Sequence, residues 1–327
     1  MAGALVTSEA AANDPAAASE AARCLARGGL VAFPTETVYG LGADATNADA
    51  VAQLYLAKGR PSFNPLIAHV ADLAAARHLA RFDERAERLA QAFWPGPLTL
   101  VLPKTSSCRV AELATAGLDT LAVRVPATPV ASGILRAFGG PVVAPSANRS
   151  GHVSPTTAAH VRADLSGRID LIVNGGPTRI GLESTIIGIF DKALLLRPGG
   201  LPRADIEAVL GERLADLPLD HRDGAQPLAP GLLASHYAPR TPVRLNATHV
   251  EEGEALLAFG NSAISGADRA VAVLNLSERG NLADAATRLF GDLRSLDGKG
   301  ARRIAVMPIP EDGLGEAIND RLRRAAA

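Results

Sequence analysis

Aromatic residues and cysteines are scarce in this sequence. Aromatic residues make up 4% of the 327 positions and hydrophobic residues 47%, so we expect a core of Ala, Val, Leu and Ile. The two cysteines, Cys24 and Cys108, lie far apart. Two cysteines at this spacing exclude a disulfide framework and a cysteine-based zinc site. We therefore expect both to be small buried residues in a reducing compartment.

An excess of one charge and a long apolar run are also lacking. The formal net charge is -1, so nothing global argues for a polyanion-binding surface, although a local basic cleft stays open. No run reaches the roughly 18 apolar residues of a membrane span. The alanine-rich start has no positive region before an apolar run, unlike a signal peptide. We expect a cytoplasmic protein without membrane contact.

Several common catalytic motifs are missing as well. The sequence contains no GxGxxG after a strand and no GxxxxGK[ST], so a Rossmann dinucleotide site or a P-loop is not expected. It also contains no HExxH zinc motif and no GxSxG elbow. A site that depends on one of these short motifs is therefore not expected.

Polar groups are instead concentrated in one early stretch, which reads LVAFPTETVYGLG at residues 30–42. A short apolar run ends at Pro34, and hydroxyl and carboxyl groups follow at Thr35, Glu36 and Thr37. We expect Gly40 and Gly42 to turn the backbone tightly. Polar loops at the ends of apolar strands are where α/β folds place their chemistry.

The periodicity of the chain predicts an α/β fold with a twisted mixed sheet and helices packed on it. Residues 1–15 are expected to be a flexible tail, with Asp14 and Pro15 starting the first helix. Thr46 or Asn47 should cap a second helix, which Pro61 ends. Apolar runs predict strands at 30–33, 66–70, 98–102, 121–125, 142–144, 171–173, 186–190 and 194–196. Further helices are expected at 83–93, 129–138, 156–163 and 203–214.

The chain divides into two domains on this interpretation. Residues 16–214 form the larger domain, and the Pro- and Gly-rich segment 215–240 is a linker that folds back as a lid. Residues 241–327 form a small Rossmann-like α/β domain, with strands at 271–276 and 304–309 and helices at 282–296 and 314–325. The terminal RLRRAAA is expected to be a solvated helix end.

Two cations and two small polar residues are candidates for a phosphate site. Lys58 and Arg60 lie at the exit of the second helix, and both can bind phosphate. The alternative is that both are surface cations. Because a cation at a helix exit contributes little to packing, we expect Lys58→Ala to leave the fold intact. Ser146 and Asn148 follow the strand at 142–144, where an ordinary turn is the alternative. Ser154 could bind an anion at a helix start or simply cap the helix.

Two buried polar residues within strands are also candidates. Arg124 lies inside the apolar strand 121–125, where an arginine is costly unless it meets an anion. A structural ion pair and a substrate carboxylate are both compatible with it. His69 lies in the strand 66–70, where a hydrogen-bonded core histidine is the alternative to a binding residue.

Four motifs in order resemble the YrdC-type domain: PTETVYGLG at 34–42, KGRP at 58–61, NPLIAHV at 64–70 and PSAN at 145–148. A further motif, HYAPRTP, follows at 236–242. The last motif and the α/β unit after it resemble the two-domain members, which are threonylcarbamoyl-AMP synthases. The resemblance covers nearly the whole chain after residue 15. It implies a YrdC-type catalytic domain at 16–214.

The resemblance also implies an activity. The family makes threonylcarbamoyl-AMP from L-threonine, bicarbonate and ATP, with Mg²⁺ accompanying the ATP, and releases pyrophosphate. Other proteins then transfer the product to tRNA, forming N6-threonylcarbamoyladenosine. A double-stranded RNA-binding module without synthase activity and a hydrogenase maturation protein are the alternatives, and a weak contact with RNA stays open.

Roles for individual residues follow from the same resemblance. L-threonine would be held by Thr37, His69, Arg124, Ala144 and Ser184. ATP would be held by Lys58, Arg60, Asn64, Thr120, Ser146, Asn148, Ser154, Arg197 and Tyr237. Among these, Lys58, Arg60, Ser146 and Asn148 would be catalytic. Metal ligands, a general base and the oligomeric state are not indicated.

Overall fold

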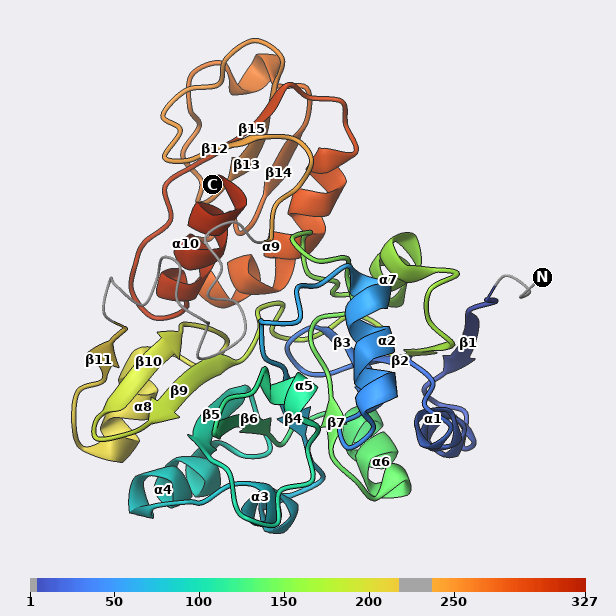
Figure 1. The fold of residues 1–327 in the computed structure, drawn as a ribbon. Coiled ribbons are helices and arrows are strands. Elements are labelled where there is room, and N and C mark those ends of the chain that lie inside the picture. Colours follow the sequence, from blue (N-terminus) through green and yellow to red (C-terminus); the bar gives the residue numbers. More distant parts are fainter. Residues whose placement is uncertain (1–4, 218–236) are drawn as a thin grey trace.

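The computed structural model describes residues 5–217 and 237–327. Figure 1 shows two α/β units, the larger one built from the first two thirds of the chain and the smaller one from the last third. No helix in these described ranges is long and apolar enough to cross a membrane. Cys24 is buried as expected, whereas Cys108 is partly exposed, and both are free thiols.

The larger unit is organised around one mixed sheet. Within residues 5–217, eleven strands form this sheet. Parallel and antiparallel neighbours alternate irregularly across it, as in the β4–β6 pair (parallel) and the β5–β6 pair (antiparallel). The spatial order is β1 (Ser8–Ala11), β8 (Leu171–Asn174), β2 (Val31–Pro34), β3 (Tyr39–Asp44), β7 (Val142–Val143), β4 (Ile67–His69), β6 (Thr120–Arg124), β5 (Leu98–Pro103), β9 (Thr185–Ile189), β10 (Ala193–Arg197) and β11 (Ala215–Asp216).

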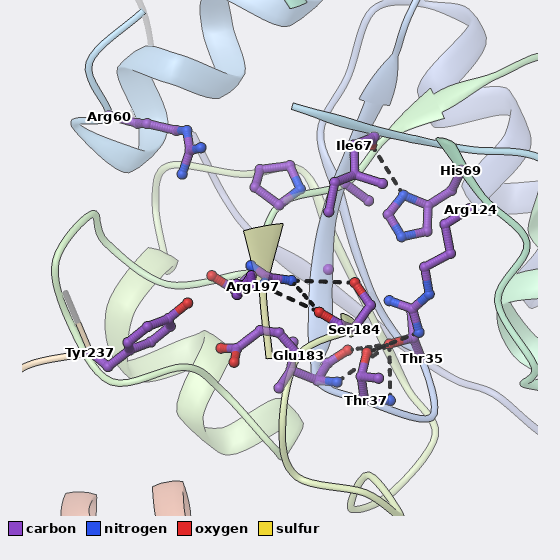
Figure 2. A pocket seen from close by; sticks show the side chains of 15 residues that line it. Thr35, Thr37, Arg60, Ile67, His69, Arg124, Glu183, Ser184, Arg197 and Tyr237 are labelled. Carbon is purple, nitrogen blue, oxygen red and sulfur yellow. Dashed lines mark hydrogen bonds between the residues drawn. The ribbon is translucent and has the colours of Figure 1, made fainter. Parts of the chain in front are cut away.

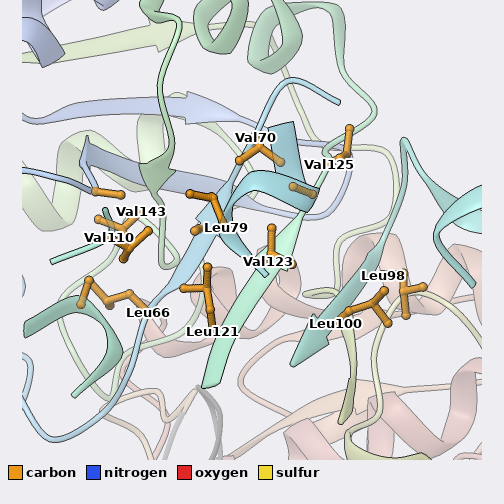
Figure 3. Close-up of a cluster of buried hydrophobic side chains, with 14 of the residues drawn as sticks. Leu66, Val70, Leu79, Leu98, Leu100, Val110, Leu121, Val123, Val125 and Val143 are labelled. Carbon is orange, nitrogen blue, oxygen red and sulfur yellow. The ribbon is translucent and has the colours of Figure 1, made fainter. Parts of the chain in front are cut away.

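Helices cover both faces of this sheet, as the alternating strand pattern requires. On β2, Val31 and Phe33 pack with α1 (Ala17–Ala26) and α6 (Pro129–Phe138), while Ala32 between them faces the opposite layer. That layer holds the aliphatic cluster of Figure 3. It is formed by α2 (Ala48–Lys58), α3 (Leu73–Leu79), α4 (Glu84–Phe93), α5 (Glu112–Thr115), α7 (Ala158–Leu165) and α8 (Arg203–Leu210).

The expectation of a flexible tail is wrong for residues 8–11. This segment is the edge strand β1, which pairs in parallel with β8 from Ser8 opposite Leu171 onward. The Thr7 hydroxyl adds a 2.7 Å hydrogen bond to the carbonyl of Ile169. An edge strand held by backbone pairing needs no apolar run, so the polar sequence SEAA concealed it. Helix α1 also begins at Ala17, later than the predicted cap at Asp14.

Helix α2 carries Lys58 to the edge of the site. The side chain of Asn47 caps it by accepting from the amides of Asp49 and Ala50 at 3.0 and 3.1 Å. Gly59, with φ +60°, ends it in the left-handed conformation, so Gly59 rather than Pro61 is the stop signal.

Gly40 and Gly42 do not form the predicted turn. Both lie in strand β3, which pairs antiparallel with β2. A Cβ atom on Gly42 would lie 2.8 Å from Phe33 Cε1 and 3.1 Å from Val142 Cγ1. A Cβ atom on Gly40 would lie 3.1 Å from the Cβ of Ala144. The glycines therefore provide close packing within the sheet rather than a turn.

The smaller unit has a parallel sheet, as predicted for a Rossmann-like domain. Its strand order is β12 (Val243–Arg244), β15 (Arg303–Val306), β13 (Glu254–Ala258) and β14 (Val273–Asn275). The strand prediction missed β12, which is two residues long, and β13, although the apolar run ALLAF at 255–259 was a visible signal for β13. Helices α9 (Leu282–Asp297) and α10 (Leu314–Ala325) lie between this sheet and the larger unit (Figure 1).

The contact between the units is apolar at its centre. One buried cluster joins Val38, Val153 and Leu182 of the larger unit to Leu289 and Phe290 of α9. Strand β11 still belongs to the large sheet, so the described part of that unit extends to residue 217, past the predicted boundary at 214. Most of the predicted lid, residues 218–236, lies outside the described residues.

The packing of Gly42 generates a stability prediction. Gly42→Ala should lower the free energy of unfolding by about 1–3 kcal/mol, because the added methyl overpacks against Phe33 and the backbone. Gly291→Ala in α9 is the control, since nothing lies within 4 Å of its Cβ position. That control should gain about 0.5–1 kcal/mol from helix propensity. Urea unfolding checks both, and a Gly42→Ala protein as stable as the wild type would contradict the account.

Candidate active site

A cavity lies where the ends of several strands of the large sheet meet (Figure 2). Its walls come from β3, β4 and β6, from the segments after β2 and β7, from the segment before β9, and from the end of β10. Nine of the predicted site residues line it: Thr37, Arg60, His69, Arg124, Ala144, Ser146, Ser184, Arg197 and Tyr237. The structure therefore gathers residues that are up to 200 positions apart (237 minus 37) around one space.

Arg124 and its partners form one end of the cavity. Arg124 Nη2 donates to Glu36 Oε1 at 2.6 Å and to Thr37 Oγ1 at 3.0 Å, and Nε donates to the carbonyl of Gly96 at 3.2 Å. Burial alone would raise the pKa of Glu36, but the charge of Arg124 and the amide of Ala127 outweigh it and lower that pKa. The ion-pair interpretation of Arg124 is thus confirmed, and the guanidinium also lines the cavity.

His69 and Ser184 complete this end. His69 Nδ1 lies 3.2 Å from the carbonyl of Ile67, and Figure 2 shows the ring close to Arg124. Burial, with the nearby charge of Arg124, lowers the pKa of His69 to about 3, so the ring is neutral at pH 7. Ser184 Oγ shares a 2.7 Å hydrogen bond with Thr99 Oγ1. This end therefore offers one guanidinium, two hydroxyls and a neutral imidazole.

Arg60 lies at the other end, next to an amide with no partner. Arg60 Nε donates to the carbonyl of Asn64 at 3.4 Å and Nη2 to that of Pro65 at 3.1 Å, while burial lowers its pKa to about 10. The Asn64 side chain is buried, and neither of its polar atoms has a hydrogen-bond partner among the described residues. A buried amide in this state is costly unless a ligand satisfies it.

Arg197 and Tyr237 lie between these ends and along one wall (Figure 2). Arg197 donates to the Ser184 carbonyl through Nε at 3.2 Å and Nη2 at 2.8 Å, and burial lowers its pKa. The Tyr237 side chain is buried and stacks on Phe290 with ring centroids 5.8 Å apart. The smaller unit thus supports a side chain that lines the cavity.

Positive charge is in excess around this cavity. Among the described lining residues, Arg60, Arg124 and Arg197 are cationic and Glu183 is the one carboxylate. Three guanidinium groups are set against two carboxylates, Glu183 in the lining and Glu36 paired with Arg124, and the remaining positive charge favours an anionic ligand. Because these arginines are buried, their attraction is screened less than that of surface cations.

Lys58 does not line the cavity but fixes one of its walls. Its Nζ donates to the carbonyls of Ser146 and Asn148, each at 2.5 Å, and the residue is 2% exposed. Burial, with the charge of Arg60, lowers the pKa of Lys58 well below its usual value. The surface-cation alternative is therefore wrong, and these contacts argue against the expectation that Lys58→Ala leaves the fold intact. Asn148 Nδ2 binds the loop too, through the carbonyls of Arg149 and His152.

Ser154 is not the predicted helix cap, since Thr157 caps α7. The Ser154 hydroxyl instead donates to Glu183 Oε1 at 2.5 Å. Sequence reasoning gave Glu183 no role, although an acid between Leu182 and Ser184 in a buried stretch was a visible signal. Thr35 was likewise left unassigned. It lines the cavity, and its Oγ1 lies 2.7 Å from Thr37 Oγ1.

Two residues expected to bind ATP, Asn64 and Thr120, are not among the lining residues. Thr120 opens β6, at the opposite end of the strand from Arg124. The residues that the structure describes contain no group of three or more His, Cys, Asp or Glu that could hold a metal ion. Glu183 is already bound by Ser154 and Arg321.

The comparisons with known families agree with this two-unit architecture. Residues 23–199 match the family described as "Telomere recombination", named for Sua5, YciO and YrdC. Residues 201–327 match the family described as "Threonylcarbamoyl-AMP synthase, C-terminal domain". The chain thus has the two-domain architecture of the Sua5 type.

Relatives of full length define the family further. A threonylcarbamoyl-AMP synthase of Bacillus subtilis is 43% identical, covering 98% of this chain and 96% of its own length. One of Pyrococcus abyssi is also 43% identical, covering 94% and 93%. The chain belongs to the threonylcarbamoyl-AMP synthase family.

Solved structures show the same arrangement. The crystal structure of P. abyssi Sua5 complexed with L-threonine has a TM-score of 0.86 and 38% identity, covering 98% of this chain and 97% of that one. The structure of E. coli YciO, at 22% identity and a TM-score of 0.53, covers 60% of this chain and shares the fold of the larger unit.

The contacts of Lys58 generate a second prediction. Lys58→Met should lower the free energy of unfolding by about 1–3 kcal/mol, because it leaves two buried carbonyls without a donor. The exposed Lys192 is the control, and Lys192→Met should change stability by less than about 0.5 kcal/mol. Urea unfolding measures both variants. Equal stabilities for the two would mean that Lys58 does not hold the loop.

The pKa of His69 generates a third prediction, on pH dependence. The pKa falls from its ordinary 6.5 to about 3 on folding, so between these pH values the unfolded chain binds one more proton here. Stability should therefore fall as the pH falls, by up to about 1.4 kcal/mol per pH unit from this residue. His69→Gln should remove that slope, and His78→Gln, at an exposed position, should keep it. The free energy of unfolding is measured from pH 7 to pH 4 for each protein. If it falls equally with pH for His69→Gln and the wild type, His69 is not the source of the slope.

Proposed function

We propose that the protein makes L-threonylcarbamoyl-AMP from L-threonine, bicarbonate and ATP and releases pyrophosphate. The observation that carries the proposal is the cavity with three buried arginines and one carboxylate, distributed over two ends. Amino acid carboxylate and nucleotide phosphates are both anions that such a cavity attracts. The B. subtilis and P. abyssi relatives are named for this product, and the P. abyssi structure contains L-threonine.

The Arg124 end suits L-threonine. We assign the substrate carboxylate to the Arg124 guanidinium, whose planar fork matches a carboxylate. Thr37 and Ser184 supply hydroxyls for the polar groups of the substrate, with the backbone at Ala144 beside them. His69, neutral at pH 7, does not repel the threonine ammonium group. The same residues held L-threonine in the sequence-based interpretation.

The Arg60 end suits ATP. We assign the phosphates to Arg60 and Arg197, with Ser146 lining the same wall. The unpartnered Asn64 amide offers both a donor and an acceptor to the nucleotide. Lys58 and Ser154 act indirectly in this assignment, because their polar atoms contact the walls rather than the cavity. Asn148 holds the loop through Nδ2, whereas its buried Oδ1 has no partner among the described residues and is available to the nucleotide.

The reaction itself needs positioning and charge more than a covalent nucleophile. The threonine amine adds to carbon dioxide with loss of a proton, or condenses with bicarbonate with loss of water, and a carbamate results. A carbamate oxygen then attacks the α-phosphate of ATP in line, and pyrophosphate leaves. Arg60 and Arg197 stabilise the charge on the phosphates, and Mg²⁺ enters with ATP as part of the substrate. No general base is assigned, because carbamate formation can proceed without one.

The product would be consumed by separate proteins that transfer the threonylcarbamoyl group to tRNA. The double-stranded RNA-binding alternative gains no support, because the relatives that match nearly the whole chain are named as synthases. Pyrophosphate release from MgATP, with L-threonine and bicarbonate each added or withheld, tests the proposal. Release only when both are present is expected, and release that ignores threonine would contradict it.

The variant Arg124→Lys tests whether the two ends of the cavity bind different substrates. Lysine keeps a positive charge opposite Glu36, whereas alanine would leave that carboxylate buried and unpaired. The fork for the threonine carboxylate is lost, so the KM for threonine should rise at least about tenfold. The KM for ATP should change by less than about twofold. Steady-state kinetics with each substrate varied measures this, and equal changes in both constants would reject the carboxylate role.

A further inference from the structure

Arg321 is a fully buried cation that comes from the smaller unit. It lies on α10 and is 0% exposed, contrary to the expectation of a solvated helix end. Each guanidinium nitrogen has a partner: Nε donates to Glu183 Oε2 at 2.7 Å, Nη1 to Asp320 Oδ2 at 2.5 Å, and Nη2 to the Pro198 carbonyl at 3.0 Å. A charge buried this deeply is tolerated only with such complete pairing.

The contacts of Arg321 lead directly to the cavity wall. Glu183, its main partner, is the carboxylate of the lining, and the other oxygen of that carboxylate accepts from Ser154. Both oxygens of Glu183 are therefore held, one by each unit. The Arg321 guanidinium also lies 4.9 Å from the ring centroid of Tyr237, which stacks on Phe290. Two lining side chains thus depend on a residue that lies outside the cavity.

The contact between Arg321 and Glu183 affects the charge that a ligand meets in the cavity. A carboxylate released from Arg321 would be drawn to the cations of the same cavity, Arg60 and Arg197, because they lie in a weakly screened environment. Pairing with them would cancel the positive charge assigned to the phosphates. The Arg321 contact holds Glu183 away from that competition.

We propose that Arg321 is a positioning residue of the nucleotide end, acting through Glu183. This inference rests on the function proposed above. It assigns to the C-terminal unit a part in the active site that the larger unit cannot supply. The alternative is that Arg321 only fastens the two units together, as the ion pair of Arg203 with Glu316 on the same helix does at 2.7 Å.

The test compares Arg321→Gln with Arg203→Gln, which breaks the other ion pair to α10 without touching the cavity. Affinities for MgATP and for L-threonine are measured by calorimetry, with thermal unfolding recorded alongside. Arg321→Gln should weaken MgATP binding and lower kcat/KM by between about tenfold and a hundredfold. Threonine affinity should stay within about twofold for Arg321→Gln, and MgATP affinity within about twofold for Arg203→Gln.

A double mutant and a conservative variant keep the inference falsifiable. Glu183→Gln removes the competing charge, so adding Arg321→Gln to it should lower MgATP affinity by less than about twofold more. If Arg321→Gln does not fold, Arg321→Lys replaces it, and it should weaken MgATP binding at an unfolding temperature close to that of Arg203→Gln. Equal losses of both ligands, multiplicative effects in the double mutant, or equal losses for the Arg203 control would overturn the positioning role. A wild type that bound MgATP without releasing pyrophosphate would overturn only the proposed reaction.

Discussion

The pairing of buried positive charge is the interaction on which the rest of this structure depends. Arg60, Arg124 and Arg197 surround the cavity, and a fourth buried arginine, Arg321, lies behind its wall. Each is held by carbonyl or carboxylate oxygens, as a buried guanidinium requires. The carbonyl acceptors of Arg60, Arg124 and Arg197 lie in segments next to the strands, so the sheet positions these buried charges. The excess of positive charge that remains then prepares the cavity for anions.

This arrangement also explains the two-unit architecture. Helices α9 and α10 cover one side of the larger unit with an apolar cluster, and the same contact brings Arg321 to Glu183 and Phe290 to Tyr237. Packing between the units and the shape of the cavity are consequently coupled. A YrdC-type domain with this particular wall needs the C-terminal unit to complete it.

Local signals in the sequence predicted much of the fold. The Asn47 cap, the helix at 129–138 and the helix at 314–325 follow from capping and periodicity, which act over a few residues. Edge pairing and close packing do not leave such a signal. Strand β1 has no apolar run, and the glycines of β3 resemble a turn until Phe33 and Val142 are placed beside them. The roles of Lys58 and Arg321 depend on partners 88 and 138 residues away, which no local pattern reveals.

The central claim is that one cavity binds L-threonine at the Arg124 end and ATP at the Arg60 end, with Arg197, which lies between the ends, beside the phosphates. A crystal structure of the protein with L-threonine and a non-hydrolysable ATP analogue tests it most directly. The account predicts the threonine carboxylate within hydrogen-bond distance of Arg124, and the phosphates beside Arg60 and Arg197. Ligands bound outside this cavity, or with the two ends exchanged, would contradict it.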